Sequence, residues 1–145
     1  MMYLLDTNVV SEMRKMRGTG SIQARIDRRV EAWVGSVSAS DLYLSVVTIL
    51  ELETGVLLLE RRDPAQGSVL RAWLQDRVIP GFSERILPVE LAVAQRCASL
   101  HVPDPMEDRD SLIAATALVH GMTLVTRNAS HFQRTGAKLL NPWEF

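Results

Sequence analysis

Three carboxylates, Asp6, Glu51 and Asp110, stand where the chain could carry out metal chemistry. Asp6 directly follows a short apolar run, residues 3–5, which has the character of a buried strand. Glu51 lies inside the otherwise apolar segment 46–52, where an ionised carboxylate is costly unless it is paired or bound to a metal. From spacing alone, a salt bridge to an arginine explains Glu51 equally well.

Asp110 begins a segment of small residues that can approach a sheet closely. Ile113, Ala114 and Ala117 follow it at i+3, i+4 and i+7, so Asp110 lies on the face of the expected helix that packs inward. Acidic residues in the first turn of a helix are also stabilised by the helix dipole, which is a purely structural explanation for this position.

Carboxylates from separate segments suit a hard divalent cation such as Mg²⁺ or Mn²⁺, which prefers oxygen ligands and keeps several waters. A cation held in this way can generate hydroxide and stabilise charge on a phosphodiester during an in-line displacement. A metal-independent ribonuclease typically uses a pair of histidines, and His101, His120 and His131 form no evident set. The residue types therefore favour metal-dependent cleavage of a phosphodiester.

Short apolar strands alternate with helical segments along the chain, and no repeat or linker divides it. We expect strands at 3–5, 42–45, 86–88, 123–126 and 137–140, and helices at 21–37, 46–59, 68–78 and 90–101. A turn is expected at 63–67, and a further helix that Asp108 caps and that ends at His120. Because the strands have the composition of strands buried on both faces, the pattern predicts an α/β sandwich with a largely parallel sheet.

Polar residues follow two of the expected strands. The segment 6–8 (Asp-Thr-Asn) follows the first strand, and the segment 126–128 (Thr-Arg-Asn) ends the strand at 123–126. In open parallel sheets, ligands bind beyond the carboxyl ends of the strands. The candidate site is therefore expected at this edge of the sheet.

Composition limits the possible classes of protein. The 145 residues, 47% of them apolar and 23% charged, are typical of one globular domain spanning residues 1–145. The net charge of −1 provides no overall attraction to RNA, so a nucleic-acid partner would need a local basic patch. The single cysteine excludes an internal disulfide and a cysteine-rich zinc site. No apolar stretch approaches the ~20 residues that span a bilayer, and the apolar run at the start is too short for a signal peptide, so we expect a cytoplasmic protein without a membrane partner.

Four ordered motifs resemble those of PIN-domain ribonuclease toxins of the VapC and FitB kind, which act in type II toxin–antitoxin systems. They cover essentially the whole chain, and together they are far more specific than any one of them alone. The motifs are 4–12 (LLDTNVVSE), 48–52 (TILEL) with Gly55, 110–117 (DSLIAATA), and 124–128 (LVTRN) with Phe132, Gly136 and 141–143 (NPW).

The resemblance implies a PIN fold, which is a three-layer α/β/α sandwich around a central, mainly parallel sheet of about five strands. It also implies an endoribonuclease that depends on Mg²⁺ or Mn²⁺, cleaves cellular RNA, is blocked by a cognate antitoxin and forms a homodimer. On this basis Asp6, Glu51 and Asp110 are the catalytic residues and metal ligands. Asn8 and Thr126 would orient carboxylates or waters beside them.

The chain departs from the family pattern at a fourth acidic position. The family often has this residue after the motif that contains Thr126, and here the two positions concerned are Asn128 and His131. An amide oxygen can still orient a metal-bound water, and imidazole binds Mn²⁺ better than Mg²⁺. We therefore expect supporting roles for both residues, one well-held metal ion, and a weak second site biased toward Mn²⁺.

Basic residues gather after the first acidic motif and suggest contacts with RNA phosphates. They are Arg14, Lys15, Arg17, Arg25, Arg28 and Arg29. A solvated helix face explains any one of them equally well. Arg127, which is closer to the expected metal site, is the strongest candidate for an RNA contact, followed by Arg14 and Lys15.

Other function classes stay open at this point. A phosphatase of the haloacid-dehalogenase kind would use Asp6 as its nucleophile, but it needs a second aspartate two residues later, where this chain has Asn8. A PIN fold that has lost catalysis and only binds a partner is supported by the missing fourth acid alone, since the three central acids are present. A dinucleotide site is disfavoured, because no G-x-G-x-x-G motif follows the first strand.

Overall fold

The computed structural model describes residues 1–16 and 25–145 and contains a five-stranded sheet in which every neighbouring pair is parallel. The strands are β1 (Tyr3–Leu5), β2 (Leu42–Ser45), β3 (Ile86–Leu87), β4 (Thr123–Val125) and β5 (Leu139–Leu140). Their order in the sheet is β3-β2-β1-β4-β5, so the chain runs outward from β1 to β3 and then returns to the other side of β1. This reversal makes a topological switch point between β1 and β4, where ligands bind in open parallel sheets.

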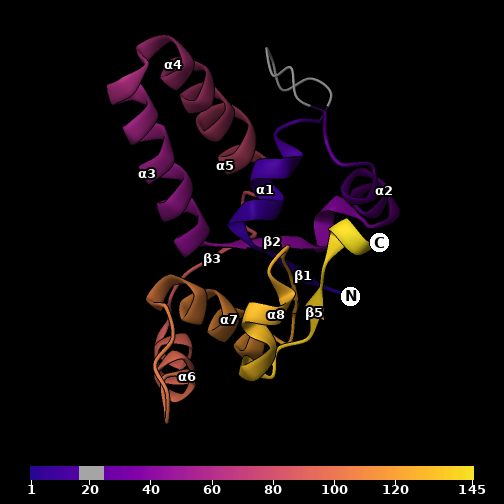
Figure 1. Cartoon of the computed structure of the whole chain (residues 1–145), viewed down its shortest axis with the longest axis vertical. Coiled ribbons are helices and arrows are strands. Elements are labelled where there is room, and N and C mark those ends of the chain that lie inside the picture. Colours follow the sequence, from indigo (N-terminus) through magenta and orange to yellow (C-terminus); the bar gives the residue numbers. More distant parts are fainter. Residues whose placement is uncertain (17–24) are drawn as a thin grey trace.

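Alternate strand residues face the two layers of helices that cover the sheet (Figure 1). Leu5, Leu44 and Val125 belong to one core, formed with α1 (Thr7–Met13), α2 (Arg28–Ser36) and α3 (Val46–Arg62). Leu4 and Leu124 belong to the other core, formed mainly with α7 (Asp108–His120) and α8 (Ala129–Phe132). The predicted three-layer α/β/α sandwich is confirmed.

The helices α3 and α4 (Pro64–Trp73) form an antiparallel pair that projects from the body of the molecule (Figure 1). Arg71 of α4 forms ion pairs with Glu53 at 2.6 Å and Glu60 at 3.2 Å, both on α3. Gly67 allows the two helices to touch, because a Cβ atom there would lie 2.4 Å from the Cα of Glu60. Glu53 is therefore a salt-bridged residue of this helical arm.

The remaining elements connect these layers. The π-helical segment Leu74–Val78 and α5 (Ile79–Gly81) follow α4, and α6 (Leu91–Leu100) packs on α7. Short 3-10 turns span Ala39–Asp41, Gln133–Thr135 and Pro142–Glu144, and the last of these is the C-terminal turn. Among the described residues, no helix is both long enough and apolar enough to cross a membrane.

Three element boundaries differ from the prediction because side chains cap the helices. The helix expected from residue 21 begins at Arg28, because the Asp27 carboxylate accepts hydrogen bonds from the first backbone N–H groups; residues 21–24 lie outside the described residues. The expected turn at 63–67 is the first turn of α4, with Asp63 as its cap and Pro64 at its first position. Glu107, not Asp108, caps α7.

Candidate active site

Asp6 links β1 to β4 at the switch point. It ends β1, is buried, and caps α1 by accepting a 2.8 Å hydrogen bond from the backbone N–H of Thr7 at Oδ1. Its other oxygen, Oδ2, accepts a 2.7 Å bond from the hydroxyl of Thr126, which directly follows β4. The two polar segments expected at one edge of the sheet therefore meet through a direct bond between these side chains.

Asn8 and Asn128 support this contact in different ways. The side-chain amide of Asn8 lies 3.4 Å from Oδ2 of Asp6, and its oxygen accepts a 3.2 Å bond from the backbone N–H of Arg127. Asn128 donates its backbone N–H to the Thr126 hydroxyl at 3.0 Å, and its side chain makes no hydrogen bond to the helix that it precedes. Asn8 thus contacts the acidic site through its side chain and Asn128 only through its backbone.

Glu51 points from the N-terminal half of α3 toward the start of α1. Its Oε1 accepts a 2.7 Å bond from the hydroxyl of Thr7, the residue that follows Asp6. Thr48, one turn earlier on α3 and fully buried, lies 3.4 Å from the same hydroxyl. Within the described residues no arginine forms an ion pair with Glu51, and the Thr7 hydroxyl binds its carboxylate instead.

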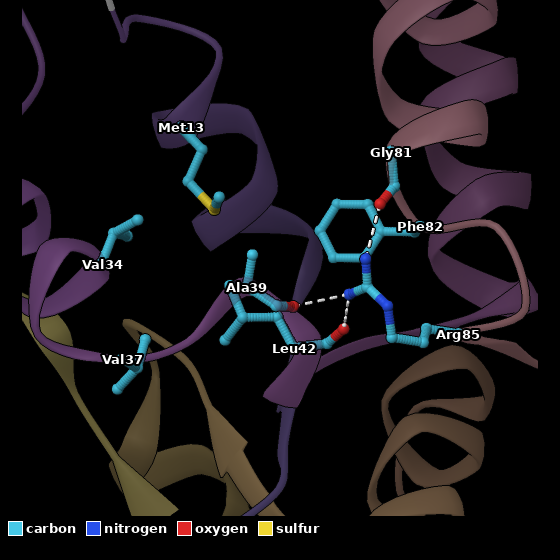
Figure 2. Close-up of a pocket in the computed structure, with 8 residues that line it drawn as sticks. All are labelled: Met13, Val34, Val37, Ala39, Leu42, Gly81, Phe82 and Arg85. Atoms are coloured by element: carbon cyan, nitrogen blue, oxygen red, sulfur yellow. Dashed lines mark hydrogen bonds between the residues drawn. The ribbon is translucent and has the colours of Figure 1, made fainter.

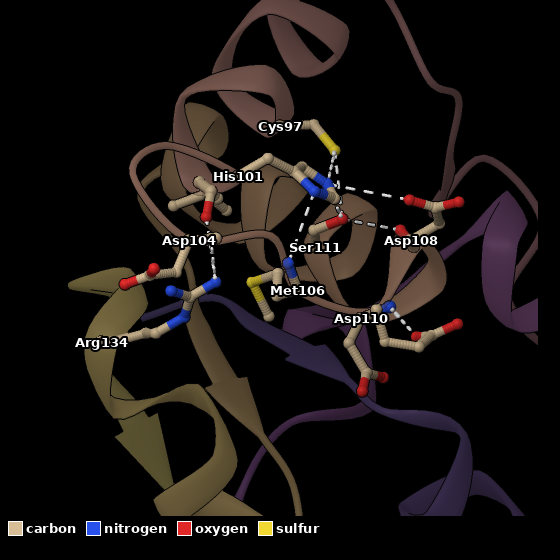
Figure 3. Close-up of polar contacts among 10 residues, drawn as sticks. Cys97, His101, Asp104, Met106, Asp108, Asp110, Ser111 and Arg134 are labelled. Atoms are coloured by element: carbon tan, nitrogen blue, oxygen red, sulfur yellow. Dashed lines mark hydrogen bonds and ion pairs between the residues drawn. The ribbon is translucent and has the colours of Figure 1, made fainter.

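Asp110 stands in the first turn of α7 at the same edge (Figure 3). Its backbone N–H donates a 2.8 Å bond to the capping carboxylate of Glu107. Its own Oδ2 lies 2.8 Å from Nε2 of His131, which is located on α8 and half exposed. The residue found in place of a fourth acid is thus in direct contact with the third predicted carboxylate.

The three predicted carboxylates share one electrostatic environment. Burial raises the pKa of Asp6, hydrogen bonds from Thr126 and Thr7 oppose the rise, and the charge of Asp110 adds to it. Burial also raises the pKa of Asp110, with further increases from the charges of Glu107 and Glu51 and an opposing effect of His131. The charge of Asp110 therefore opposes ionisation of Asp6, and the charges of Glu107 and Glu51 oppose ionisation of Asp110.

This donor set fits a hard divalent cation in its chemistry. The groups are carboxylate oxygens held in a partly buried, mutually repulsive cluster, and a cation would relieve that repulsion. Within the described part of the chain, no three His, Cys, Asp or Glu side chains already form a group that could hold a metal ion. Glu51 and Asp110 are instead bonded to Thr7 and His131, so the ligand role of the three acids stays a prediction.

A separate polar network lies between α6 and α7, near Asp110 (Figure 3). The Ser111 hydroxyl lies 2.9 Å from Nε2 of His101 and 3.3 Å from Sγ of Cys97, and it donates to the backbone oxygen of Asp108. The backbone N–H of Met106 donates to Nδ1 of His101, which leaves Nε2 as the protonated nitrogen of the neutral ring. His101 therefore connects the end of α6 to the start of α7 through hydrogen bonds. Because its Nε2 carries the proton, this nitrogen does not act as a base toward Ser111.

The basic residues after the first motif are partly used within the protein. Arg14 lies over the ring of Trp73 at 5.9 Å, and burial lowers its pKa. Lys15 forms a 3.0 Å ion pair with Glu12. Arg17 lies outside the described residues. Arg127 is exposed and stacks at 5.0 Å on Trp143, in the C-terminal turn.

An apolar groove of about 230 Å³ opens elsewhere, between the end of α1, the end of α2 and the segment after α5 (Figure 2). Met13, Val34 and Phe82 contribute to its walls. The guanidinium of Arg85 does not offer a free charge to a ligand there, because it donates to backbone carbonyls, including those of Ala39 and Gly81. None of the predicted catalytic residues lines this groove, which is unsuited to a phosphate.

Sequence reasoning named Thr126 and Asn8 as supports of the site but missed two other residues that hold predicted ones in place. Thr7 binds Glu51 although 44 positions separate them, and the only available signal was its place directly after Asp6. The contribution of Trp143 was equally hidden, since its stacking on Arg127 depends on how the C-terminal turn folds back.

Comparisons with known proteins agree with this fold. The family model described as "PIN domain" matches residues 3–138. The "VapC ribonuclease Y4jK" of Sinorhizobium fredii is 34% identical over 150 residues, covering 99% of each chain. "Toxin FitB" of Neisseria gonorrhoeae is 35% identical over 147 residues, covering 98% of this chain and 99% of that protein. The crystal structure of FitAcB from Neisseria gonorrhoeae superposes with a TM-score of 0.86 at 34% identity, covering 99% and 100% of the two chains.

Proposed function

Because this chain belongs to the PIN-domain family and is a VapC/FitB-like member of it, we propose that it is a metal-dependent endoribonuclease toxin of a type II toxin–antitoxin system. The observation that carries the proposal is the acidic cluster at the switch point of the sheet. Burial raises the pKa values of two of its carboxyls, Asp6 and Asp110, and the charge of another acid of the cluster adds to each rise. Such a cluster lowers the stability of the fold, and clusters of acids with shifted pKa values are typical of functional sites.

Asp6, Glu51 and Asp110 would hold Mg²⁺ or Mn²⁺, which supplies Lewis-acid stabilisation of the phosphodiester charge and activation of water when bound. Hydrogen bonds from the chain's own residues orient these carboxylate oxygens. Thr126 and the backbone N–H of Thr7 fix the two oxygens of Asp6, and the Thr7 hydroxyl fixes Glu51. His131 is half exposed, and its Nε2 holds Oδ2 of Asp110 at 2.8 Å.

The direct test is cleavage of RNA by the purified protein with Mg²⁺ or Mn²⁺ and with EDTA. Cleavage that EDTA abolishes supports the proposal. Cleavage that continues in EDTA would overturn the metal-dependent mechanism. No cleavage in either metal would favour the partner-binding alternative, and a trapped aspartyl-phosphate on Asp6 would favour the phosphatase.

Replacement of His131 by Asp tests the fourth position. An acid here restores the ligand type that the family often has, and carboxylates suit Mg²⁺ better than imidazole does. We expect H131D to increase the ratio of activity in Mg²⁺ to activity in Mn²⁺ by about 10-fold. The matched control is His120→Asp, because His120 lies at the other end of α7. An unchanged metal ratio in H131D would refute a second site biased toward Mn²⁺.

A cognate antitoxin encoded by a neighbouring gene would cover the acidic edge and block RNA access in the cytoplasm. Production of the chain alone should then arrest bacterial growth, and co-production of the adjacent small protein should relieve the arrest. Arg127, Arg14 and Lys15 remain the candidate RNA contacts, and Arg127 is the only one of the three that is exposed rather than half-buried.

The exposed face of α3 is suited to a second copy of the chain. Val46, Leu50 and Leu57 lie along one side of the helix, with 38%, 52% and 55% of their surfaces exposed. We expect Leu57→Glu to shift the protein from dimer to monomer at micromolar concentration in light scattering. Leu91→Glu, which alters a 75% exposed leucine on α6, should leave the dimer intact. A dimer that survives L57E would place the interface elsewhere.

A further inference from the structure

The C-terminal turn places a cationic surface beside the acidic edge. Arg127 follows Thr126, which bonds Asp6, and its guanidinium lies over the ring of Trp143 at 5.0 Å from the ring centre. In Figure 1 the C-terminal turn lies against α2, and Arg29 of that helix donates a 3.1 Å bond to the backbone oxygen of Trp143. Two arginines therefore contact one tryptophan, and one of them directly follows the residue that bonds Asp6.

The backbone around Arg127 is fixed from both sides. Its N–H donates to the side-chain oxygen of Asn8 at 3.2 Å, and its carbonyl accepts a 3.3 Å bond from the side-chain amide of Asn141. Asn141 also accepts the backbone N–H of Trp143 at 3.0 Å, so one side chain positions both the arginine and the ring beneath it. The guanidinium is thus held in a defined place relative to Asp6 before any ligand arrives.

The charge of Arg127 is available to a ligand. Its side chain is exposed, and no carboxylate in the described ranges forms an ion pair with it. The guanidinium lies over the Trp143 ring, and within the described residues no acceptor binds its N–H groups, which can therefore hold a phosphate with two parallel bonds. A side chain already held by an aromatic ring also loses less conformational entropy on binding.

RNA needs such a contact in this protein. The net charge of the chain is −1, and the catalytic edge adds Glu107 and Asp108 to the three proposed ligands, so the approaching phosphate backbone meets repulsion. We propose that Arg127, whose guanidinium lies over Trp143, binds a phosphate of single-stranded RNA that neighbours the scissile phosphate. Arg29 is the next cation along this surface. This inference rests on the proposed function and adds a substrate-positioning site to it.

The test is binding of a fluorescent single-stranded RNA of mixed sequence in EDTA, which prevents metal-dependent cleavage, at several salt concentrations. Loss of one phosphate contact should reduce the slope of log Kd against log salt by about 0.7, and we expect R127A to show this change with about 10-fold weaker binding at low salt. Lys138→Ala is the matched control, because it removes one exposed positive charge. Lys138 lies just before the start of β5, whereas the C-terminal turn follows the end of that strand. This replacement should leave both quantities unchanged.

Two further variants separate stacking from charge. R127K keeps the charge but stacks less well, and W143L keeps an apolar side chain but removes the ring; both should retain the salt slope and bind about threefold more weakly. Melting temperatures show that each variant is folded. Equal binding by R127A and K138A would overturn the proposal, and wild-type affinity in both R127K and W143L would overturn its stacked arrangement. If the wild-type protein neither binds nor cleaves RNA, the proposed function itself fails.

Discussion

Asp6→Asn should lower the rate of RNA cleavage by on the order of 1000-fold, because it removes the most buried of the three proposed metal ligands. An amide keeps the shape of the side chain but supplies one neutral oxygen in place of two that share a negative charge. The loss should appear with either Mg²⁺ or Mn²⁺ and should not be recovered at higher metal concentration. Initial rates of cleavage under saturating RNA are the appropriate measurement.

The fold should tolerate this substitution. The amide oxygen can still accept the N–H of Thr7, and the amide nitrogen can donate to the hydroxyl of Thr126, which rotates to accept it. Because burial raises the pKa of Asp6, its ionised form is costly in the metal-free protein, so D6N should melt at a higher temperature than the wild type. Lower activity together with higher stability separates a functional loss from unfolding.

Asp108→Asn provides the matched control. Asp108 lies in the first turn of α7 near Asp110, but 91% of its side chain is exposed. Its replacement removes one negative charge from the same edge without touching the three proposed ligands, and activity should change by no more than about threefold. D6N activity above about a tenth of the wild type would show that Asp6 is not a catalytic metal ligand.

The sheet was predictable because its strands have a simple signature. Short apolar runs such as 3–5 and 123–125 can only be buried strands between helical segments, and the structure has them in parallel register at the centre of the sheet. The switch point follows from the strand order, which no local pattern reveals. Helix starts were less predictable where one capping side chain decides them, as Asp27 does for α2.

Part of the site followed from single residues. A carboxylate inside an apolar helix carries a cost that points to a special role, and Glu51 was recognised in this way, whereas Asp6 was recognised by its place at the end of a strand. The sequence predicted that polar groups meet at one edge of the sheet, but it did not predict the long-range contacts that hold them there, such as the bond between Thr126 and Asp6, 120 positions apart. The contact between His131 and Asp110 is equally non-local, and periodicity within α7 and α8 does not indicate it.

The acidic cluster also makes the stability of the metal-free protein depend on pH in an unusual direction. The pKa values of Asp6 and Asp110 are raised in the folded state, so folding takes up protons between the ordinary value of about 4 and the raised values. The free energy of unfolding from these two groups therefore falls as the pH rises through that window and stays low above it. Glu53, whose pKa is lowered by Arg71, acts in the opposite direction, so the comparison needs variants.

Thermal melts in EDTA from pH 4 to pH 8 should show this effect as a difference between proteins. Wild type and a D6N/D110N double variant should converge near pH 4, and the double variant should become progressively more stable at higher pH.

Addition of Mg²⁺ or Mn²⁺ at neutral pH should reverse the order, because a cation that binds only the folded state at 100 times its Kd adds about 2.7 kcal/mol, or roughly 5 to 10 °C for a chain of this size. Only the wild type should gain this stability, since two of the three proposed ligands are replaced in the double variant. An equal shift of both proteins by the metal would mean that the cation binds outside the acidic cluster. A wild type that grows more stable relative to the variant as the pH rises in EDTA would mean that the three carboxylates do not repel one another in the folded chain.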